Sequence, residues 1–316
     1  MISRRLLRIK TLQILYAFYN SDKTAFVKYE KELTFSINKF YDLYHYLMLL
    51  LIDVSKFSEM RIDQGKQKRM ASAEDISPNT RFIDNEIITQ LKNTPKFNSY
   101  LTAKKMSWVN HPELIRNLYL EIIESEEYKN YMALEESSYK ADKEIVIDIC
   151  EKIFPYNEFL TQVLEEQSIF WNDDVEFALS MIIKTIGKAK RTSTNGLEIL
   201  DLYKSDEDIE FVNILFKKTI NNYSENLKLI EKFTDNWDID RIALIDIVIM
   251  QMAITELMEF PSIPSKVTLN EYIDLAKYYS TSKSGVFING ILDKVMANLK
   301  SDNKMTKRGR GLIGEV

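Results

Sequence analysis

The side chains best suited to chemistry gather at the start of the chain, and they are cations. Arg4, Arg5, Arg8 and Lys10 give the first 20 residues a charge of +4 without a single acid. Residues 300–316 carry five cations against two acids, while the whole chain has a net charge of −5. The part between the two ends must therefore carry −12. Such a distribution allows a polyanion to bind only at particular places on the molecule.

Residue types that catalysis or metal binding requires are scarce. Cys150 is the single cysteine, which excludes a disulfide framework and a zinc site built on paired cysteines. Asp42 and His45 have the spacing of half a helical metal site, but the other histidine, His111, does not supply a second copy. A G-x-G-x-x-G pattern over 309–314 leaves no room for a following helix and is interpreted as tail. We expect no catalytic residue, no metal and no cofactor, and therefore a protein that is not an enzyme.

The composition predicts an all-α fold. Gly 8 and Pro 6 among 316 residues are far below the usual share of roughly 12%. Sandwiches, barrels and wound sheets need frequent turns, and turns use these two residues. The longest apolar run, Leu47–Ile52, is much shorter than a membrane span of ~20 residues. With no visible signal peptide, we expect a cytoplasmic protein without a membrane segment.

Helices must position the N-terminal cations. A first helix is predicted over 3–20, with Ser3 as its N-cap. A second, longer helix is predicted over 25–60, and the polar stretch 61–80 is predicted to be a loop. Shorter helical pieces follow up to residue 205.

The C-terminal third has the clearest helical pattern. Residues 239–258 are apolar on nearly every side, which is typical of the buried central helix of a bundle. Further helices are predicted over 267–279 and 285–299. Gly290 lies inside the last of these, and a glycine in mid-helix suggests that another backbone or a ligand passes close by.

Three stretches, taken in order, carry a family resemblance. They are RRLLRIKTLQILY at 4–16, WDIDRI at 237–242 leading to Asp246 and Glu256-Leu257, and IPSKVTLNEYIDLAK at 263–277 with FINGILDK at 287–294. This set resembles the NusB family of bacterial transcription antitermination factors.

The resemblance also predicts a domain organisation. It covers residues 1–20 and 207–300, which are expected to form the RNA- and partner-binding core. Residues 21–206 are expected to hold the second core helix and a large helical insertion. Residues 301–316 are expected to be a basic, disordered tail.

The resemblance implies a fold and a function. The implied fold is NusB-like antiparallel helical bundles, here with the additional insertion. The implied function is binding of boxA-type single-stranded RNA together with NusE, a small-subunit ribosomal protein. The pair then joins an RNA polymerase antitermination complex, typically in ribosomal RNA operons, and a homodimer is left open.

The residue chemistry agrees with RNA binding, because cations bind phosphates and aromatic rings stack on bases. Positions that match the family's RNA-facing regions are Arg4, Arg5, Arg8, Lys10, Gln13, Tyr16, Tyr279, Lys283 and Phe287. A solvated face for the cations and a core role for Tyr16 and Phe287 are the alternatives.

An acidic surface of the C-terminal bundle would suit a basic ribosomal protein. The residues expected to bind this partner are Asp246, Glu256, Asn270 and Glu271. Asn270 and Glu271 could equally form a buried hydrogen-bonded pair that sets helix packing.

Two other functions compete. NusB-like domains also occur in ribosomal RNA cytosine methyltransferases, so the chain could be the RNA-binding part of an RNA-modifying system. That function needs a glycine-rich cofactor loop and a catalytic cysteine, whereas Cys150 lies in a helical stretch. The other is a helical scaffold that has lost RNA binding, against which the intact basic N-terminus argues.

Overall fold

The computed structural model describes residues 2–21, 25–234 and 239–307 of the chain. The described residues form helices and connecting turns, with no strand among them, and the all-α prediction is confirmed. Two compact units are present, one formed by Asn38–Leu202 and the other by Ile2–Ile37 with the chain from Tyr203 onward. We call them the central unit and the terminal unit. The motif residues Trp237 and Asp238 and the tail residues 308–316 lie outside the described part.

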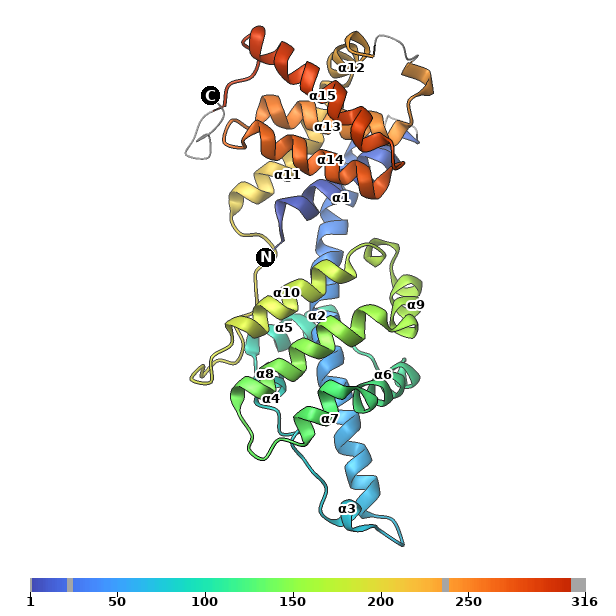
Figure 1. Ribbon diagram of the computed structural model, residues 1–316, viewed down its shortest axis with the longest axis vertical. Helices are drawn as coiled ribbons and strands as arrows, with labels where there is room; N and C mark the ends of the chain where they lie inside the picture. Colours follow the sequence, from blue (N-terminus) through green and yellow to red (C-terminus); the bar gives the residue numbers. More distant parts are fainter. Residues whose placement is uncertain (1, 22–24, 235–238, 308–316) are drawn as a thin grey trace. The chain divides into compact units, whose positions relative to one another are not determined.

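The terminal unit combines the two ends of the chain. Its elements are α1 (Arg4–Tyr19), the start of α2 (Phe26–Lys66), α11 (Asp206–Asn221), α12 (Tyr223–Lys232), η4 (Ile239–Arg241), α13 (Leu244–Glu259), α14 (Ser265–Tyr279) and α15 (Ser284–Ser301). Figure 1 shows α13 enclosed by α11, α14 and α15, and α13 packs against each of these helices.

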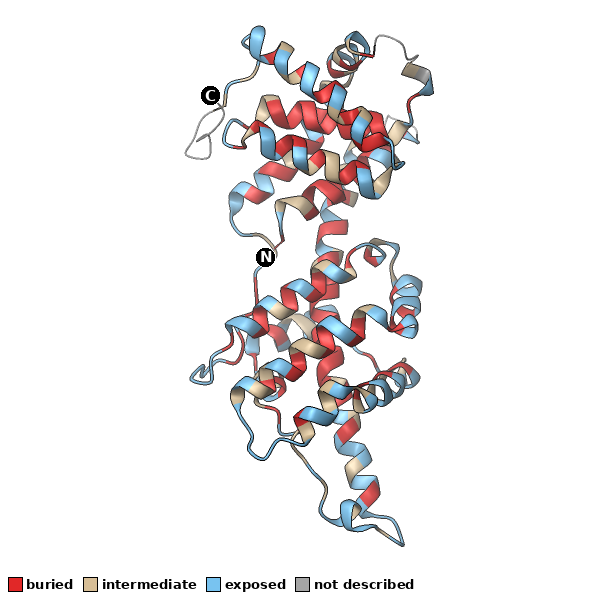
Figure 2. Cartoon of the chain, in the orientation of Figure 1, coloured by how far each residue is buried: buried red, intermediate tan, exposed pale blue. Residues whose placement is uncertain are grey.

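Helix α13 is the centre of the terminal unit. Every residue from Asp246 to Leu257 is buried, which appears as a continuous red helix in Figure 2. A helix that is apolar on all sides must be surrounded by other helices, because any exposed face would place apolar surface in water. The prediction of a buried central helix over 239–258 is therefore confirmed for α13.

Helix α1 is held on the terminal unit by its apolar side chains. Ser3 caps it as predicted, since its Oγ accepts a hydrogen bond from the Leu6 amide at 3.2 Å. Leu6, Leu7, Leu12 and Leu15 are buried, and the helix packs against α11 and α13. The first helix is thus part of the core of this unit.

The central unit contains the remainder of α2 and the shorter helices. These are α3 (Ala73–Ile76), α4 (Glu86–Lys92), α5 (Pro95–Lys104), α6 (Pro112–Glu124), α7 (Glu126–Met132), α8 (Tyr139–Asp148), η1 (Ile149–Ile153), η2 (Phe154–Tyr156), α9 (Glu158–Gln167), η3 (Ile169–Trp171) and α10 (Val175–Lys188). Trp108, Tyr44 and Phe97 are among its largest fully buried side chains.

The predicted loop over 61–80 is wrong at its start. Helix α2 continues to Lys66, and the short α3 follows within the same stretch. Asp75 links the end of α2 to α3. Its carboxylate accepts hydrogen bonds from Lys68 Nζ at 2.8 Å and from the Ser72 amide at 3.0 Å. Local polar contacts of this kind stabilise helical turns without an apolar periodicity.

Gly290 does not mark a close approach within the chain. Apart from its chain neighbours and the adjacent backbone of α15, no atom of the described residues lies within 4 Å of where a Cβ would stand, and the residue is exposed. The packing interpretation of this glycine is therefore wrong. None of the helices in the described ranges is long and apolar enough to cross a bilayer.

Candidate nucleic-acid interface

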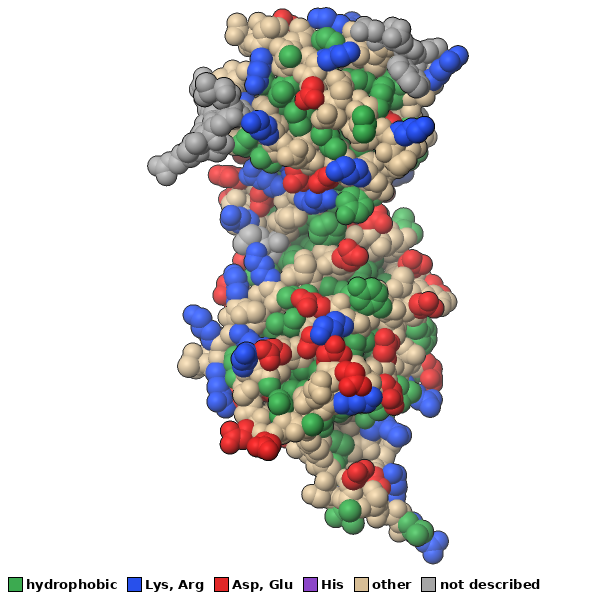
Figure 3. All heavy atoms as spheres, in the orientation of Figure 1, with side chains coloured by type: hydrophobic (Ala, Val, Ile, Leu, Met, Phe, Trp, Pro, Cys, Tyr) green, Lys and Arg blue, Asp and Glu red, His purple; other side chains and the backbone are tan. Residues whose placement is uncertain are grey.

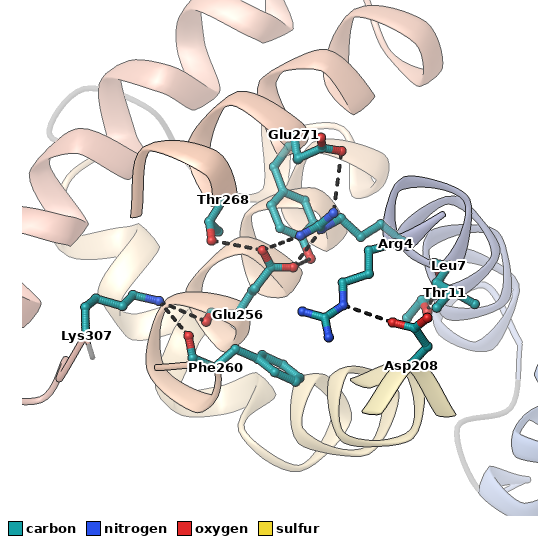
Figure 4. A network of polar contacts seen from close by, with 11 residues as sticks. Arg4, Leu7, Thr11, Asp208, Glu256, Phe260, Thr268, Glu271 and Lys307 are labelled. Carbon is teal, nitrogen blue, oxygen red and sulfur yellow. Dashed lines mark hydrogen bonds and ion pairs between the residues drawn. The ribbon is translucent and has the colours of Figure 1, made fainter. Parts of the chain in front are cut away.

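Arg8 lies in the interior of the terminal unit and not on its surface. Its Nε and one Nη each lie 2.8 Å from a carboxylate oxygen of Glu256 on α13, and both side chains are almost fully buried. Thr268 and Tyr272 of α14 donate further hydrogen bonds to the same carboxylate at 2.9 and 3.1 Å. Figure 4 shows Glu256 at the centre of this network. The network therefore links three helices, α1, α13 and α14.

The electrostatics of this network favour the charged arginine. Burial opposes a charge on Arg8, but the hydrogen bonds and charge of Glu256 outweigh burial and raise the Arg8 pKa above its usual value. Burial, followed by the nearby charge of Glu256, also raises the pKa of Tyr272, so its hydroxyl stays a hydrogen-bond donor. The bidentate geometry is the strongest arrangement available to an arginine and a carboxylate.

The two preceding arginines lie at the surface and also have acidic neighbours. Arg4 Nε lies 3.1 Å from Asp208 of α11, and Arg5 lies 3.5 Å from Asp274 of α14. The Arg4 and Arg5 side chains are 34% and 32% exposed. Arg5 also lies over the ring of Tyr278, 5.7 Å from its centroid. A phosphate that binds either arginine must therefore compete with a carboxylate.

The predicted roles of Arg8 and Lys10 in RNA contact are wrong. Arg8 is 3% exposed and Lys10 is 1% exposed. A phosphate cannot reach a side chain that the protein covers, so these two cations belong to the interior. Arg4 and Arg5 remain candidates at the start of α1.

Further along α1, Gln13 is half-buried and Tyr16 is 42% exposed. Arg5 and Tyr16 share one side of the helix, but Ile9 and Leu12 lie between them on that side and are buried. The helix rise of 1.5 Å per residue places Arg5 and Tyr16 about 16 Å apart along the axis. They could contact different nucleotides of one strand but form no continuous patch on α1.

The turn from α14 to α15 carries the other candidates. Lys283 is exposed, while Tyr279 and Phe287 are half-buried. Two neighbours that the sequence did not single out, Tyr278 and Val286, are 77% and 80% exposed. Tyr278 contacts Arg5, so the structure connects this turn with the start of α1. Two adjacent tyrosines at a helix end could have indicated that one of them faces solvent.

Two of the predicted partner-binding residues are also internal. Glu256 is 0% exposed and serves as the counter-ion of Arg8. Asp246 is 6% exposed, and its Oδ2 accepts a hydrogen bond from Ser284 Oγ at 2.8 Å. A partner protein cannot contact either carboxylate, so the assignment of both to the partner surface is wrong.

The Asp246 carboxylate organises the turn that carries Lys283. Ser284 Oγ donates to Asp246 and lies 2.9 Å from the hydroxyls of Ser280 and Thr281. Since a hydroxyl has one proton, Ser280 and Thr281 donate to Ser284. The buried acid thus holds three hydroxyls of the turn.

Asn270 and Glu271 do not form the buried pair considered as an alternative. Asn270 is exposed, and the Glu271 side chain is 26% exposed with Oε2 at 3.5 Å from Arg8. Asn270 is on the outer side of α14 with Asp274, whereas the buried Oε2 of Glu271 faces Arg8. Among the described residues, no group of His, Cys, Asp and Glu has the arrangement of a metal site.

The sequence of this chain is similar to those of known proteins. The chain is 39% identical over 143 residues to the transcription antitermination protein NusB of Salinibacter ruber, covering 43% of this chain and 89% of that protein. The chain belongs to the NusB family.

Two further NusB proteins are similar in sequence to this chain. The NusB of Desulfatibacillum aliphaticivorans is 35% identical over 136 residues, covering 42% of this chain and 95% of that protein. The NusB of Chloroherpeton thalassium is 42% identical over 110 residues, covering 34% of this chain and 52% of the relative. A solved structure of T. maritima NusB is 27% identical and covers 43% of this chain and 84% of that one, with a TM-score of 0.29.

The NusB family match spans residues 174–297. It begins in the central unit, at the residue before α10, and continues through α11 to α15 of the terminal unit. Buried Arg8 joins α1 to this matched region through Glu256. The chain is thus a NusB family protein with a further helical part between α1 and the matched region.

Proposed function

We propose that the chain is an RNA-binding transcription antitermination factor that binds boxA-type single-stranded RNA together with the ribosomal protein NusE. The observation that carries the proposal is the 39% identity to a protein named for transcription antitermination, because it extends over 89% of that relative. The typical setting would be an RNA polymerase antitermination complex in ribosomal RNA operons. The proposed role is binding and not catalysis, and the proposed location is the cytoplasm.

The exposed candidates support an RNA surface on the terminal unit. Arg4, Arg5 and Lys283 supply cations for phosphates, and Tyr16 supplies an exposed ring for stacking. Gln13, Tyr279 and Phe287 have part of their surface exposed. Tyr278 joins this set, because its exposed ring lies beside Arg5. RNA must displace the partly exposed Arg5–Asp274 ion pair, which is worth about 0–1 kcal/mol. Asp208 is only 7% exposed, so Arg4 is held by a largely buried carboxylate and is the harder of the two arginines to recruit.

The partner surface is proposed on the outer side of α14. Asn270 and Asp274 present a polar and an acidic group there, which suit a basic ribosomal protein. Glu271 is 26% exposed beside them, with its Oε2 held toward Arg8. The terminal unit would then serve as the RNA- and partner-binding core. A homodimer formed through the RNA-facing surface is a further part of the proposal.

The proposal is tested by anisotropy titrations of the full chain with a labelled boxA-type RNA and a scrambled RNA of equal length, with and without NusE. We expect preference for the boxA-type RNA, and tighter binding with NusE present. Equal binding of both RNAs without any effect of NusE would contradict the proposal and favour a helical scaffold.

A further inference from the structure

The acidic charge of the chain is concentrated in one stretch of the central unit. Residues 111–176 contain 17 acidic and 5 basic residues and so carry −12, which leaves +7 for the rest of the chain. This stretch forms α6 to α9 and the short elements between them. Figure 3 shows Asp and Glu side chains gathered over α7, α8 and α9. The field of this surface repels RNA and attracts cations.

A groove lies within this acidic region, between α7 and the face of α8 and η1. Its volume is 340 Å³, which is in the range of small binding sites. Apolar atoms of Tyr131, Leu134, Ala141 and Ile145 line it. Four carboxylates border these apolar residues, namely Glu126, Glu127, Glu144 and Asp148. The groove therefore combines an apolar floor with an acidic rim.

One cation, the half-exposed Lys152, lies among the rim carboxylates. Its Nζ lies 2.9 Å from Glu127 and 2.8 Å from Asp148. The hydrogen bond from Lys152 lowers the pKa of Glu127, so this carboxylate stays charged. One ammonium thus already lies between carboxylates from two helices at this groove.

The other two rim carboxylates, Glu126 and Glu144, form only long and exposed ion pairs with lysines. Glu126 lies 3.7 Å from Lys129, and Glu144 lies 3.5 Å from Lys140. The Glu126 and Glu144 side chains are 81% and 60% exposed, so water screens these contacts and a stronger cationic partner can replace them.

We propose that this groove binds a lysine- or arginine-rich segment of a partner protein. The long side chains of such a segment would lay their aliphatic stems on Leu134, which is 41% exposed, and on Ala141, and would direct their charged ends to the rim. Charge complementarity selects a basic partner, and the apolar floor selects a peptide over a hydrated metal ion. The site lies in the central unit and is independent of the RNA surface proposed for the terminal unit.

The test uses the full chain and a fluorescein-labelled peptide, KLAKKLAK, in anisotropy titrations at low and at moderate salt. A peptide with glutamate at each lysine position is the charge control. We expect saturable binding of the basic peptide that weakens with salt, and no binding of the acidic one. Absence of binding by the basic peptide would overturn the proposal.

Two pairs of matched variants distinguish the groove from a general acidic field. Glu126→Gln with Glu144→Gln should weaken peptide binding about five-fold, while Glu165→Gln with Glu166→Gln, on α9, should change it less than about two-fold. Leu134→Ala should weaken binding about three-fold, whereas Leu120→Ala, at similar exposure outside the groove, should not. Equal losses for both glutamate pairs, with no effect of Leu134→Ala, would overturn the groove as the site. RNA binding should be unchanged in all four variants.

Discussion

Arg8 on α1 and Glu256 on α13 form a buried bidentate ion pair, with both nitrogen–oxygen distances at 2.8 Å. The arginine belongs to the basic N-terminus and the acid to the central helix of the terminal unit. Their pairing neutralises, inside the protein, a cation that the sequence alone would assign to the surface. It also explains how the first helix is tied to a part of the chain more than two hundred residues away.

Removing either partner of this pair should destabilise the protein strongly. Arg8→Ala leaves Glu256 buried without its counter-ion, and we expect a loss of about 3–5 kcal/mol in the free energy of unfolding. Urea denaturation followed by circular dichroism measures this loss. Arg5→Ala is the matched control and should cost about 0–1 kcal/mol, because its ion pair is partly exposed to water. Similar losses for the two variants would contradict the internal role of Arg8.

His45 should make the stability of the central unit depend on pH. Burial lowers the pKa of His45 from 6.5 to about 4, although its hydrogen bond to the Tyr41 carbonyl opposes this shift. The unfolded chain then binds more protons than the folded one between these values, so stability falls as pH falls from about 6.5 to about 4. We expect a loss of about 2 kcal/mol between pH 7 and pH 5.

The control for this dependence is His45→Gln, compared with the original chain at both pH values. Its stability should change less between pH 7 and pH 5, because the titrating group is removed. An unchanged difference between the two pH values would show that other groups cause the dependence. His45 stacks on Tyr100 at 3.9 Å between centroids, so the variant is also expected to be less stable at pH 7.

The salt dependence of RNA binding should come from the exposed cations. Arg5→Ala with Lys283→Ala removes two proposed phosphate contacts, which should flatten the slope of log affinity against log salt by roughly 1.4. Anisotropy titrations at several salt concentrations measure this slope. Arg116→Ala with Lys129→Ala changes the charge equally on the central unit and should leave the slope as it was. A slope that both pairs alter equally would indicate only a general charge effect.

Ser284 should stabilise the turn between α14 and α15 through Asp246. Ser284→Ala removes the donor to a buried carboxylate, with an expected loss of about 1–3 kcal/mol in the free energy of unfolding. Hydrogen exchange should increase at the amides of the turn. Ser282→Ala, at an exposed position of the same turn, should change neither quantity measurably. If Ser284→Ala resembled Ser282→Ala, Asp246 would have no role in the turn.

The sequence by itself determined the helical class, the buried central helix and the family. These predictions rest on local properties, namely the low glycine and proline content and the apolar residues on every side of 239–258. Such properties do not depend on which distant residues pack nearby. The motif at 263–277 is equally local. The end of α2 was harder to predict, because polar contacts around Asp75 leave no apolar periodicity to follow.

Only the tertiary structure decided which charged residues are available to a partner. Arg5 and Arg8 are three residues apart on the same basic helix, yet the Arg5 side chain is 32% exposed and that of Arg8 is 4% exposed. The difference comes from Glu256, a distant residue whose burial requires a cation beside it. Asp246 was likewise predicted to lie on the partner surface, but its carboxylate is buried and accepts a hydrogen bond from Ser284. The charge and spacing of residues can be read from the sequence, whereas the burial of a side chain depends on which distant residues pack against it.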